Sequence, residues 1–168
     1  SRIEDALLKK VNGPDAPLVR RRALESLGYS SRHEVTPLIR KFFHSTETEW
    51  IVSALYAMGR SLDPQWEQDV LASIASPDPE IKFEAVRAAG PLEFSSARSL
   101  LLDMLDHAET LDDELRSAVI WSLSQIGGEG VAEVFEKLYE ETEDDEEIEF
   151  LELAVENLEF KENGDEFD

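Results

Sequence analysis

A pattern of apolar and small side chains recurs five times along this chain and constrains the fold more than any other feature. Its clearest copy runs from Leu115 to Gly127, where apolar residues spaced three or four apart lie on one face of a helix. With Leu115 as position zero, apolar side chains return at positions five and eight of copies that begin at Val19, Trp50, Ile81, Leu115 and Phe150. These starts lie 31, 31, 34 and 35 residues apart, and a period of that size indicates an array of helical repeats.

The segments between these copies carry apolar faces of their own, so each repeat is predicted to be a pair of helices. One matching position of the second helices is held by Leu7, Leu38, Val70, Leu100 and Val134. By this register the segment from Ile3 to Val11 is a second helix without its partner. Either this end of the chain is an atypical cap, or the chain starts within a repeat as a fragment of a longer array, which we favour. The uncapped N-terminal repeat of such a fragment would expose an apolar face through which copies of the chain could associate.

Helix boundaries are predicted from capping residues. Expected N-caps are Asp15, Asp63 and Asp78, and two capping boxes are expected, at Ser31 with Glu34 and at Thr46 with Glu49. Gly28 and Gly127 follow first helices and are expected to end them, Gly28 in the left-handed conformation. A ladder of ion pairs is also predicted, which joins Arg20, Lys82 and Arg116 to Asp15, Asp78 and Asp112 or Asp113.

The 168 residues carry a net charge of -22, and this charge is unevenly distributed. Residues 1–60 hold ten Lys or Arg against seven Asp or Glu, whereas residues 61–168 hold six against 31. A field of this sign repels phosphate backbones and anionic membranes, so neither nucleic acid nor a membrane is expected as a partner. The chain lacks cysteine and any apolar run of about 20 residues, which favours a cytoplasmic protein without a membrane span.

The repeats resemble the short HEAT-type repeats of bacterial proteins, also called phycobilisome-lyase-like repeats. Their first helix begins with an apolar residue and Arg and ends in Leu-Gly, and Val19-Arg20, Ile81-Lys82 and Leu115-Arg116 match its start. Trp50-Ile51 departs from the motif, and the last copy lacks both the arginine and the glycine. The resemblance implies stacked helix pairs that bind proteins, so we expect a non-catalytic scaffold for protein–protein interaction.

Two enzymatic alternatives stay open beside the scaffold. HEAT-like DNA glycosylases use a basic concave surface, and the one basic cluster here consists of Arg20, Arg21, Arg22, Arg40 and Lys41. A bilin lyase relative is the second, although no cysteine or histidine cluster points to chromophore capture. The three histidines are isolated in sequence, and paired carboxylates lie on polar helix faces. We therefore expect no metal site, cofactor or catalytic residue.

Large side chains occupy outward positions of the middle first helices, where polar residues would be expected. These residues are Val52, Tyr56, Phe83 and Trp121, with Arg87 among them. They either seal the joints between repeats or form an apolar ridge that binds a partner through aromatic and arginine anchors. On a second helix, Arg40 and Lys41 are the candidates for attracting an acidic partner.

Together these patterns predict an all-α fold, a right-handed α-solenoid of stacked antiparallel helix pairs with the first helices on its convex side. Leu24 and Leu123 are predicted core residues. Residues 1–160 are expected to form a single domain. Residues 161–168 are expected to be an acidic, frayed tail, because Asn163 and Gly164 break the pattern and little apolar surface follows.

Overall fold

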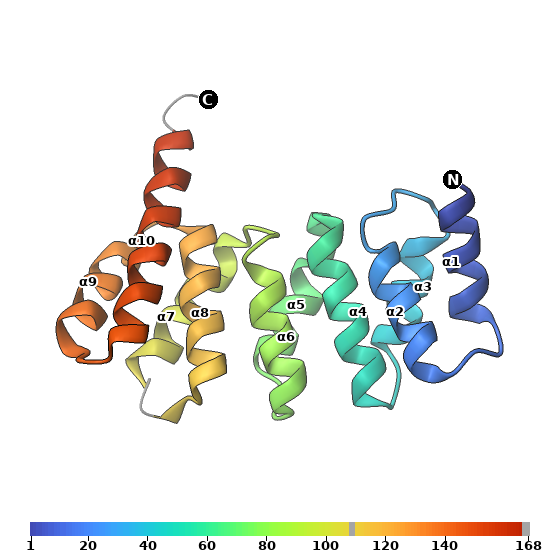
Figure 1. Ribbon diagram of the computed structural model, residues 1–168, viewed down its shortest axis with the longest axis horizontal. Coiled ribbons are helices and arrows are strands. Elements are labelled where there is room, and N and C mark those ends of the chain that lie inside the picture. Colours follow the sequence, from blue (N-terminus) through green and yellow to red (C-terminus); the bar gives the residue numbers. More distant parts are fainter. Residues whose placement is uncertain (108–109, 166–168) are drawn as a thin grey trace. The chain divides into compact units, whose positions relative to one another are not determined.

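The computed structural model describes residues 1–107 and 110–165, and in this part of the chain every regular element is a helix (Figure 1). The predicted all-α fold is thereby confirmed. The elements are α1 (Arg2–Asn12), α2 (Pro17–Leu27), α3 (Val35–Phe43), α4 (Thr48–Ser61), η1 (Pro64–Trp66), α5 (Glu67–Ile74), α6 (Pro79–Ala89), η2 (Ser95–Ala97), α7 (Arg98–Asp106), α8 (Asp113–Ile126), α9 (Val131–Glu141) and α10 (Asp145–Asp165). The last helix runs past Lys161, where the sequence pattern placed its end.

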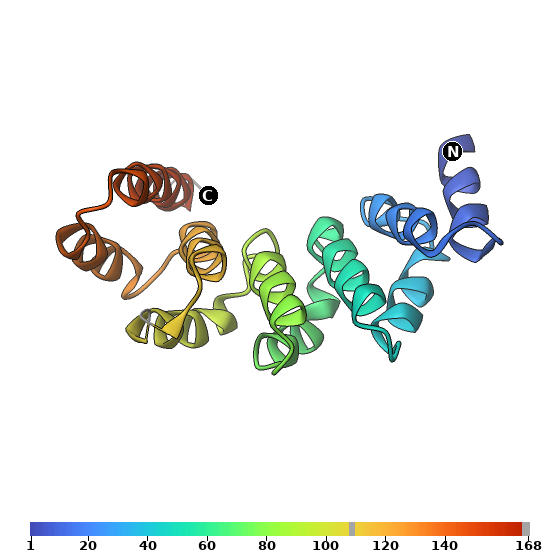
Figure 2. The same ribbon diagram turned by 60° about the horizontal axis from the view of Figure 1, so that its bottom comes forward.

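Two compact units divide the chain, Ser1–Ala88 and Ala89–Asp168, and first and second helices alternate in both. In the first unit, the first helices α2 and α4 lie side by side, with α1 packed against α2 and α3 against α4. In the second unit, α8 and α10 pack together (Figure 2). Helix α7 contacts α8, and helix α9 contacts α8 and α10. First helices thus form one layer of each unit and second helices form the other.

Positions five and eight of the first helices form the core, as the repeat pattern predicts. Leu24 and Leu123 are fully buried. The alignment of the second helices is wrong by one residue at Val70, which is itself fully buried. Leu38, Leu100 and Val134 instead each directly precede a buried residue, namely Ile39, Leu101 and Phe135. The short helix η2 that precedes α7 buries Ala97, and the buried face continues from there at intervals of four residues.

The glycines at position nine, Gly28, Gly59 and Gly90, are packing residues rather than left-handed caps, whereas Gly127 has a φ of 65° and ends α8 as predicted. Gly28 has a right-handed helical backbone, with φ -53° and ψ -32°, so the conformation predicted for it is wrong. Gly59 lies inside α4. A Cβ atom placed on Gly28 would lie 2.8 Å from the carbonyl oxygen of Ala57, and one placed on Gly59 would lie 3.1 Å from the Cα atom of Ala88. Each glycine therefore lets the next first helix approach its backbone.

These close approaches share one register, in which position nine of a first helix meets position seven of the next. In the second unit Gly90 has the same register, since a Cβ atom placed on it would lie 3.0 Å from the Cα atom of Ser122. At the following joint a serine replaces the glycine, and the amide of Asn157 on α10 donates a 3.0 Å hydrogen bond to the hydroxyl of Ser124 on α8. The recurring contact explains why position nine carries glycine or a small residue.

Some predicted caps are present and others are not. The carboxylates of Asp63 and Asp78 accept hydrogen bonds from the amides of Gln65 and Glu80, at 2.9 and 3.0 Å. The N-caps of α2, α3 and α4 make no side-chain hydrogen bond, so the predictions at Asp15, Ser31 with Glu34, and Thr46 with Glu49 are wrong. Basic side chains hold two of these acids instead: Lys10 binds Asp15 at 2.9 Å, and Arg32 binds Glu34 at 2.7 Å.

Replacing Gly28 by alanine tests this packing role. A glycine next to a helix usually tolerates alanine, but here the added methyl group would meet the backbone of α4, so we expect a loss of about 1–3 kcal/mol in the free energy of unfolding. Gly164→Ala is the matched control. No atom lies within 4 Å of its Cβ position inside α10, so alanine should be neutral or stabilise by up to about 1 kcal/mol. Denaturant unfolding of the two variants measures the difference, and equal effects would contradict the packing role.

Candidate partner-binding surfaces

The outward face of the first helices in unit Ser1–Ala88 carries two tyrosines joined by an arginine. The guanidinium of Arg60 lies over the ring of Tyr29 at 4.0 Å and over that of Tyr56 at 5.2 Å, measured to the ring centroids. Arg60 also donates a 2.8 Å hydrogen bond to the Tyr56 hydroxyl. Tyr29 is 69% exposed, and Tyr56 is half-buried. We call Tyr29, Tyr56 and Arg60 the tyrosine–arginine cluster.

Sequence reasoning identified Tyr56 but missed the other two members of this cluster. Arg60 could have been found, because it lies four residues after Tyr56 on α4, and side chains with that spacing meet on a helix surface. Tyr29 lies in the loop between α2 and α3, where helical periodicity gives no information. It reaches Arg60 because α2 and α4 pack together, and that is a tertiary contact.

Three other predicted residues lie on the same helices. Val52 on α4 and Phe83 on α6 are half-buried, and Arg87 is exposed. The Arg87 guanidinium lies 5.7 Å from the Phe83 ring centroid, so the expected stacking on an aromatic ring is present. Val52 and Phe83 are thus partly covered by neighbours, and Arg60 and Arg87 each lie against a ring.

Trp121 belongs to unit Ala89–Asp168 and has a different environment. It is 39% exposed, and its ring lies 6.2 Å from that of Phe150, the residue at position zero of the last copy. Because Trp121 is on α8 and Phe150 is on α10, this contact covers the joint between two first helices. At this position the geometry favours the joint-sealing interpretation.

The residues of the predicted basic cluster make contacts within the first unit. Arg40 lies over the Trp66 ring at 4.8 Å and pairs with Asp69 at 3.4 Å, and Lys41 lies 5.3 Å from the Phe42 ring. The predicted ion-pair ladder is wrong in its partners. Arg20 donates to the carbonyl of Val11 at 2.8 Å, Arg116 pairs with Glu147 at 2.6 Å, and the carboxylate of Asp78 caps α6. Arg20, Arg40 and Lys41 of the predicted basic cluster therefore each contact a different partner.

Beneath the outward face of the first unit lies a layer of buried polar residues. Ser53, fully buried, donates a 2.8 Å hydrogen bond to Glu25 and accepts one of 3.2 Å from Arg21. Glu84 is 7% exposed, and its Oε2 atom has no hydrogen-bond partner among the described residues. Burial raises the pKa of Glu84 above its ordinary value; Arg87, 3.5 Å away, opposes the rise, and the Glu25 carboxylate adds to it.

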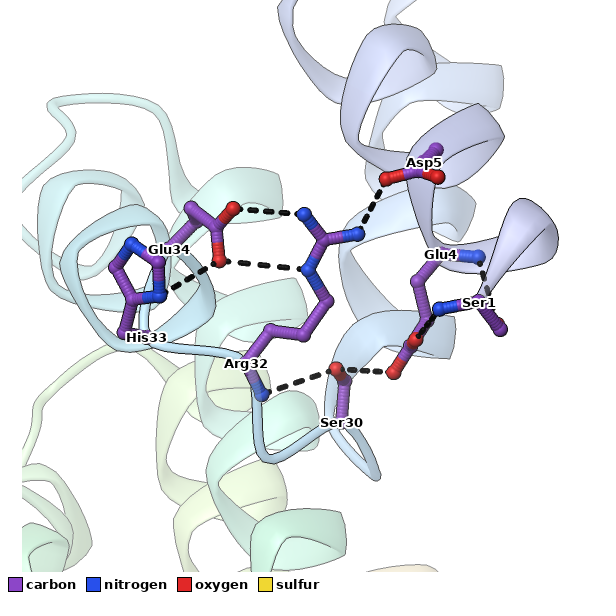
Figure 3. A network of polar contacts seen from close by, with 7 residues as sticks. All are labelled: Ser1, Glu4, Asp5, Ser30, Arg32, His33 and Glu34. Carbon is purple, nitrogen blue, oxygen red and sulfur yellow. Dashed lines mark hydrogen bonds and ion pairs between the residues drawn. The ribbon is translucent and has the colours of Figure 1, made fainter.

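At the N-terminal end, a polar network fastens α1 to the loop between α2 and α3 (Figure 3). Arg32 lies between Asp5 and Glu34 and pairs with both. The Ser30 hydroxyl donates a 2.6 Å hydrogen bond to Glu4. The guanidinium of Arg32 holds the pKa of Asp5 and that of Glu34 below their ordinary values. The network is in contact with solvent, and its hydrogen bonds and ion pairs join α1 to the loop between α2 and α3.

Within residues 1–107 and 110–165, no group of three or more His, Asp or Glu side chains is placed to hold a metal ion. In the same residues, no helix is both long enough and apolar enough to cross a membrane. The family model for HEAT repeats matches residues 67–154, which is just over half of the chain. A search of curated proteins gives no match.

The buried carboxylate of Glu84 predicts a pH-dependent stability. Because its folded pKa is raised, the folded state binds this proton more tightly than the unfolded chain does, so the stability due to Glu84 is greatest at low pH and falls as pH rises through the folded pKa. Glu84→Gln stays neutral throughout. The unfolding free energy of the variant relative to wild type should therefore increase as the pH rises above the ordinary glutamate pKa of 4.5 and through the raised pKa of the folded protein. Glu80→Gln, on the exposed side of α6, is the control, and a pH-independent difference for Glu84→Gln would contradict the prediction.

Proposed function

The chain belongs to the HEAT-repeat family, and we propose that it is a non-catalytic scaffold that binds other proteins. HEAT repeats are commonly used as protein-interaction scaffolds. Repeats of this kind stack so that each one contacts its neighbours, and the stack offers extended surfaces on both helix layers. Such a surface needs no reactive group to act, because its task is to hold another protein in a fixed position.

The tyrosine–arginine cluster is the observation that carries this proposal. Tyrosine, tryptophan and arginine are the residues that most often anchor interfaces, because each combines a large contact area with a polar group. Tyr29 is 69% exposed, so most of its ring is open to contact with a partner. The guanidinium between the two tyrosines already fixes their rings, so little side-chain freedom would be lost on binding.

The basic residues support a protein partner over nucleic acid. A DNA glycosylase needs arginines and lysines that are available to phosphates, whereas Arg20 and Arg40 lie against Trp50 and Trp66 in this chain. The net charge of -22 would repel a phosphate backbone as well. Among the described residues, no contact gives a specific reason to propose a bilin lyase.

Several finer features belong to the same proposal. We infer a right-handed solenoid of antiparallel helix pairs, of the short bacterial repeat type, that acts in the cytoplasm without catalysis. We also infer that copies of the chain associate through α1, since Ile3 on that helix is 72% exposed.

Alanine substitutions separate partner anchors from joint seals. Tyr29→Ala and Tyr56→Ala should reduce the affinity for a partner by upwards of about 2 kcal/mol. The melting temperature should change little for Tyr29→Ala, because that ring is 69% exposed, and somewhat more for Tyr56→Ala, because that ring is half-buried. Trp121→Ala should lower the melting temperature instead, because its ring lies against Phe150. Affinity capture from a lysate of the source organism identifies the partner, and calorimetry then compares the purified variants.

Tyr139→Ala is the control for these variants, since Tyr139 is 46% exposed on α9 and belongs to the other unit of the chain. It should change neither affinity nor melting temperature by much. A partner that binds Tyr29→Ala and Tyr56→Ala as tightly as wild type would remove the cluster as its binding surface. The absence of any captured protein would count against the scaffold function itself.

A further inference from the structure

The two units of the chain differ sharply in charge. Residues 1–88 hold 13 acidic and 12 basic side chains, whereas residues 89–168 hold 25 acidic and four basic ones. Nearly all of the net charge of -22 therefore belongs to the second unit. So many like charges on one small unit repel each other and destabilise its compact state. A partner of opposite charge would relieve that repulsion.

A cleft of about 500 Å³ opens at the edge of this unit where α7 and α9 end and α8 and α10 begin. Its floor is apolar. Leu105 of α7 and Leu138 of α9 are almost fully buried there, and Val134 of α9 is half-exposed between them. A floor of this kind fits one apolar side chain of a ligand better than it fits water, because burying the ligand group removes two apolar surfaces from water at once.

The rim of the cleft is acidic. Five carboxylates line it against two basic side chains: Asp106, Glu141, Glu143, Asp144 and Glu147 against Arg116 and Lys137. The structure already uses two of these acids, because Glu147 pairs with Arg116 at 2.6 Å and Asp144 accepts the amide hydrogen bond of Glu146 at 2.9 Å.

Other rim carboxylates are available to a ligand. Lys137 lies 4.0 Å from Glu141, and both side chains are more than 60% exposed. Asp106 and Glu143 are exposed, and neither makes a hydrogen bond or ion pair within the described residues.

A second cleft, of about 330 Å³, adjoins the first across the Arg116–Glu147 pair. Both clefts are lined by Arg116, Asp144 and Glu147, and the second adds Ile120 and Phe150 to the apolar surface. Asp113 and Glu146 add further carboxylates to its rim. The two hollows together make an elongated site with apolar patches and acidic edges, which is longer than a single side chain requires.

We propose that these adjoining clefts bind a Lys- and Arg-rich segment of a partner protein, with an apolar side chain of that segment seated on the floor formed by Leu105, Val134 and Leu138. This proposal rests on the scaffold function and adds the chemistry of one partner. The cations of the segment pair with the rim carboxylates, which speeds the encounter and fixes the direction of the segment. The apolar floor selects a polypeptide over a small polyamine, which has no side chain to place there.

The test measures the binding of a fluorescein-labelled peptide to the full chain by fluorescence anisotropy. The peptide has about twelve residues, mostly lysine and arginine with a central leucine. Binding is measured at an ionic strength of about 0.15 M. Asp106→Asn combined with Glu143→Gln should weaken binding about tenfold or more. The control variant Glu129→Gln with Glu159→Gln removes the same charge from exposed positions of the unit outside both clefts, and should weaken binding less than about twofold.

A second pair of measurements examines the floor. Val134→Ala should weaken the binding of the leucine-containing peptide and leave the binding of an all-lysine peptide of equal charge unchanged. Wild type should also bind the leucine-containing peptide more tightly than the all-lysine peptide. The proposal would be overturned if the cleft and control variants lost equal affinity, or if the peptide did not bind. It would also be overturned if spermine displaced the labelled peptide at the same concentration as the unlabelled peptide does. A partner that binds through the tyrosine–arginine cluster would still bind Asp106→Asn with Glu143→Gln, so failure here is distinguishable from failure of the scaffold function.

Discussion

The close approach of consecutive first helices is the contact on which the rest of this structure depends. It recurs at one register, where position nine of a helix faces position seven of the next, and the pairs are Gly28 with Ala57, Gly59 with Ala88, Gly90 with Ser122, and Ser124 with Asn157. A missing or small side chain at position nine brings two backbones together, and dispersion attraction then acts over the length of both helices. The apolar residues at positions five and eight are buried by the same approach, except Val155 of the last copy, which is half-buried.

The outward face follows from this tight spacing. When helices lie this close, large side chains at outward positions reach across to the neighbouring helix, as Trp121 does toward Phe150. Arginines fill the remaining space, and Arg60 lies between two tyrosine rings while Arg87 covers Phe83. A surface of fixed aromatic and guanidinium groups results, and such a surface suits the binding of another protein. The acidic clefts of the second unit would supply a different chemistry at a different place on the chain.

The repeat and its core were predictable because they depend on periodicity within single helices. The spacing of the five copies predicted the alternation of helices, and burial of Leu24 and Leu123 follows from it. The role of Gly28 was not predictable, because a glycine after a helix has the same sequence signature whether it caps the helix or admits a neighbour. The predicted cap of α3 failed for a different reason, because Glu34 pairs with Arg32 instead of with the backbone at the start of the helix.

Candidate surfaces were harder to predict than the fold. Outward positions on a helix can be counted, so Tyr56, Phe83, Arg87 and Trp121 were found as out-of-place residues. What each one touches depends on the adjacent repeat. Tyr29 lies in a loop and reaches Arg60 through tertiary packing, and the apolar floor of the acidic cleft combines α7 with α9. Periodicity carries no information about such combinations.

The joint between Ser124 and Asn157 allows the central claim to be measured, because both partners have side chains that can be removed. A double-mutant cycle with Ser124→Ala, Asn157→Ala and the double variant gives their coupling in the free energy of unfolding. If α8 and α10 meet at this register, the two substitutions should couple by about 0.5–3 kcal/mol, as residues in direct contact do. Effects that add within about 0.3 kcal/mol would show that the two helices do not meet there, and would contradict this account of the repeat.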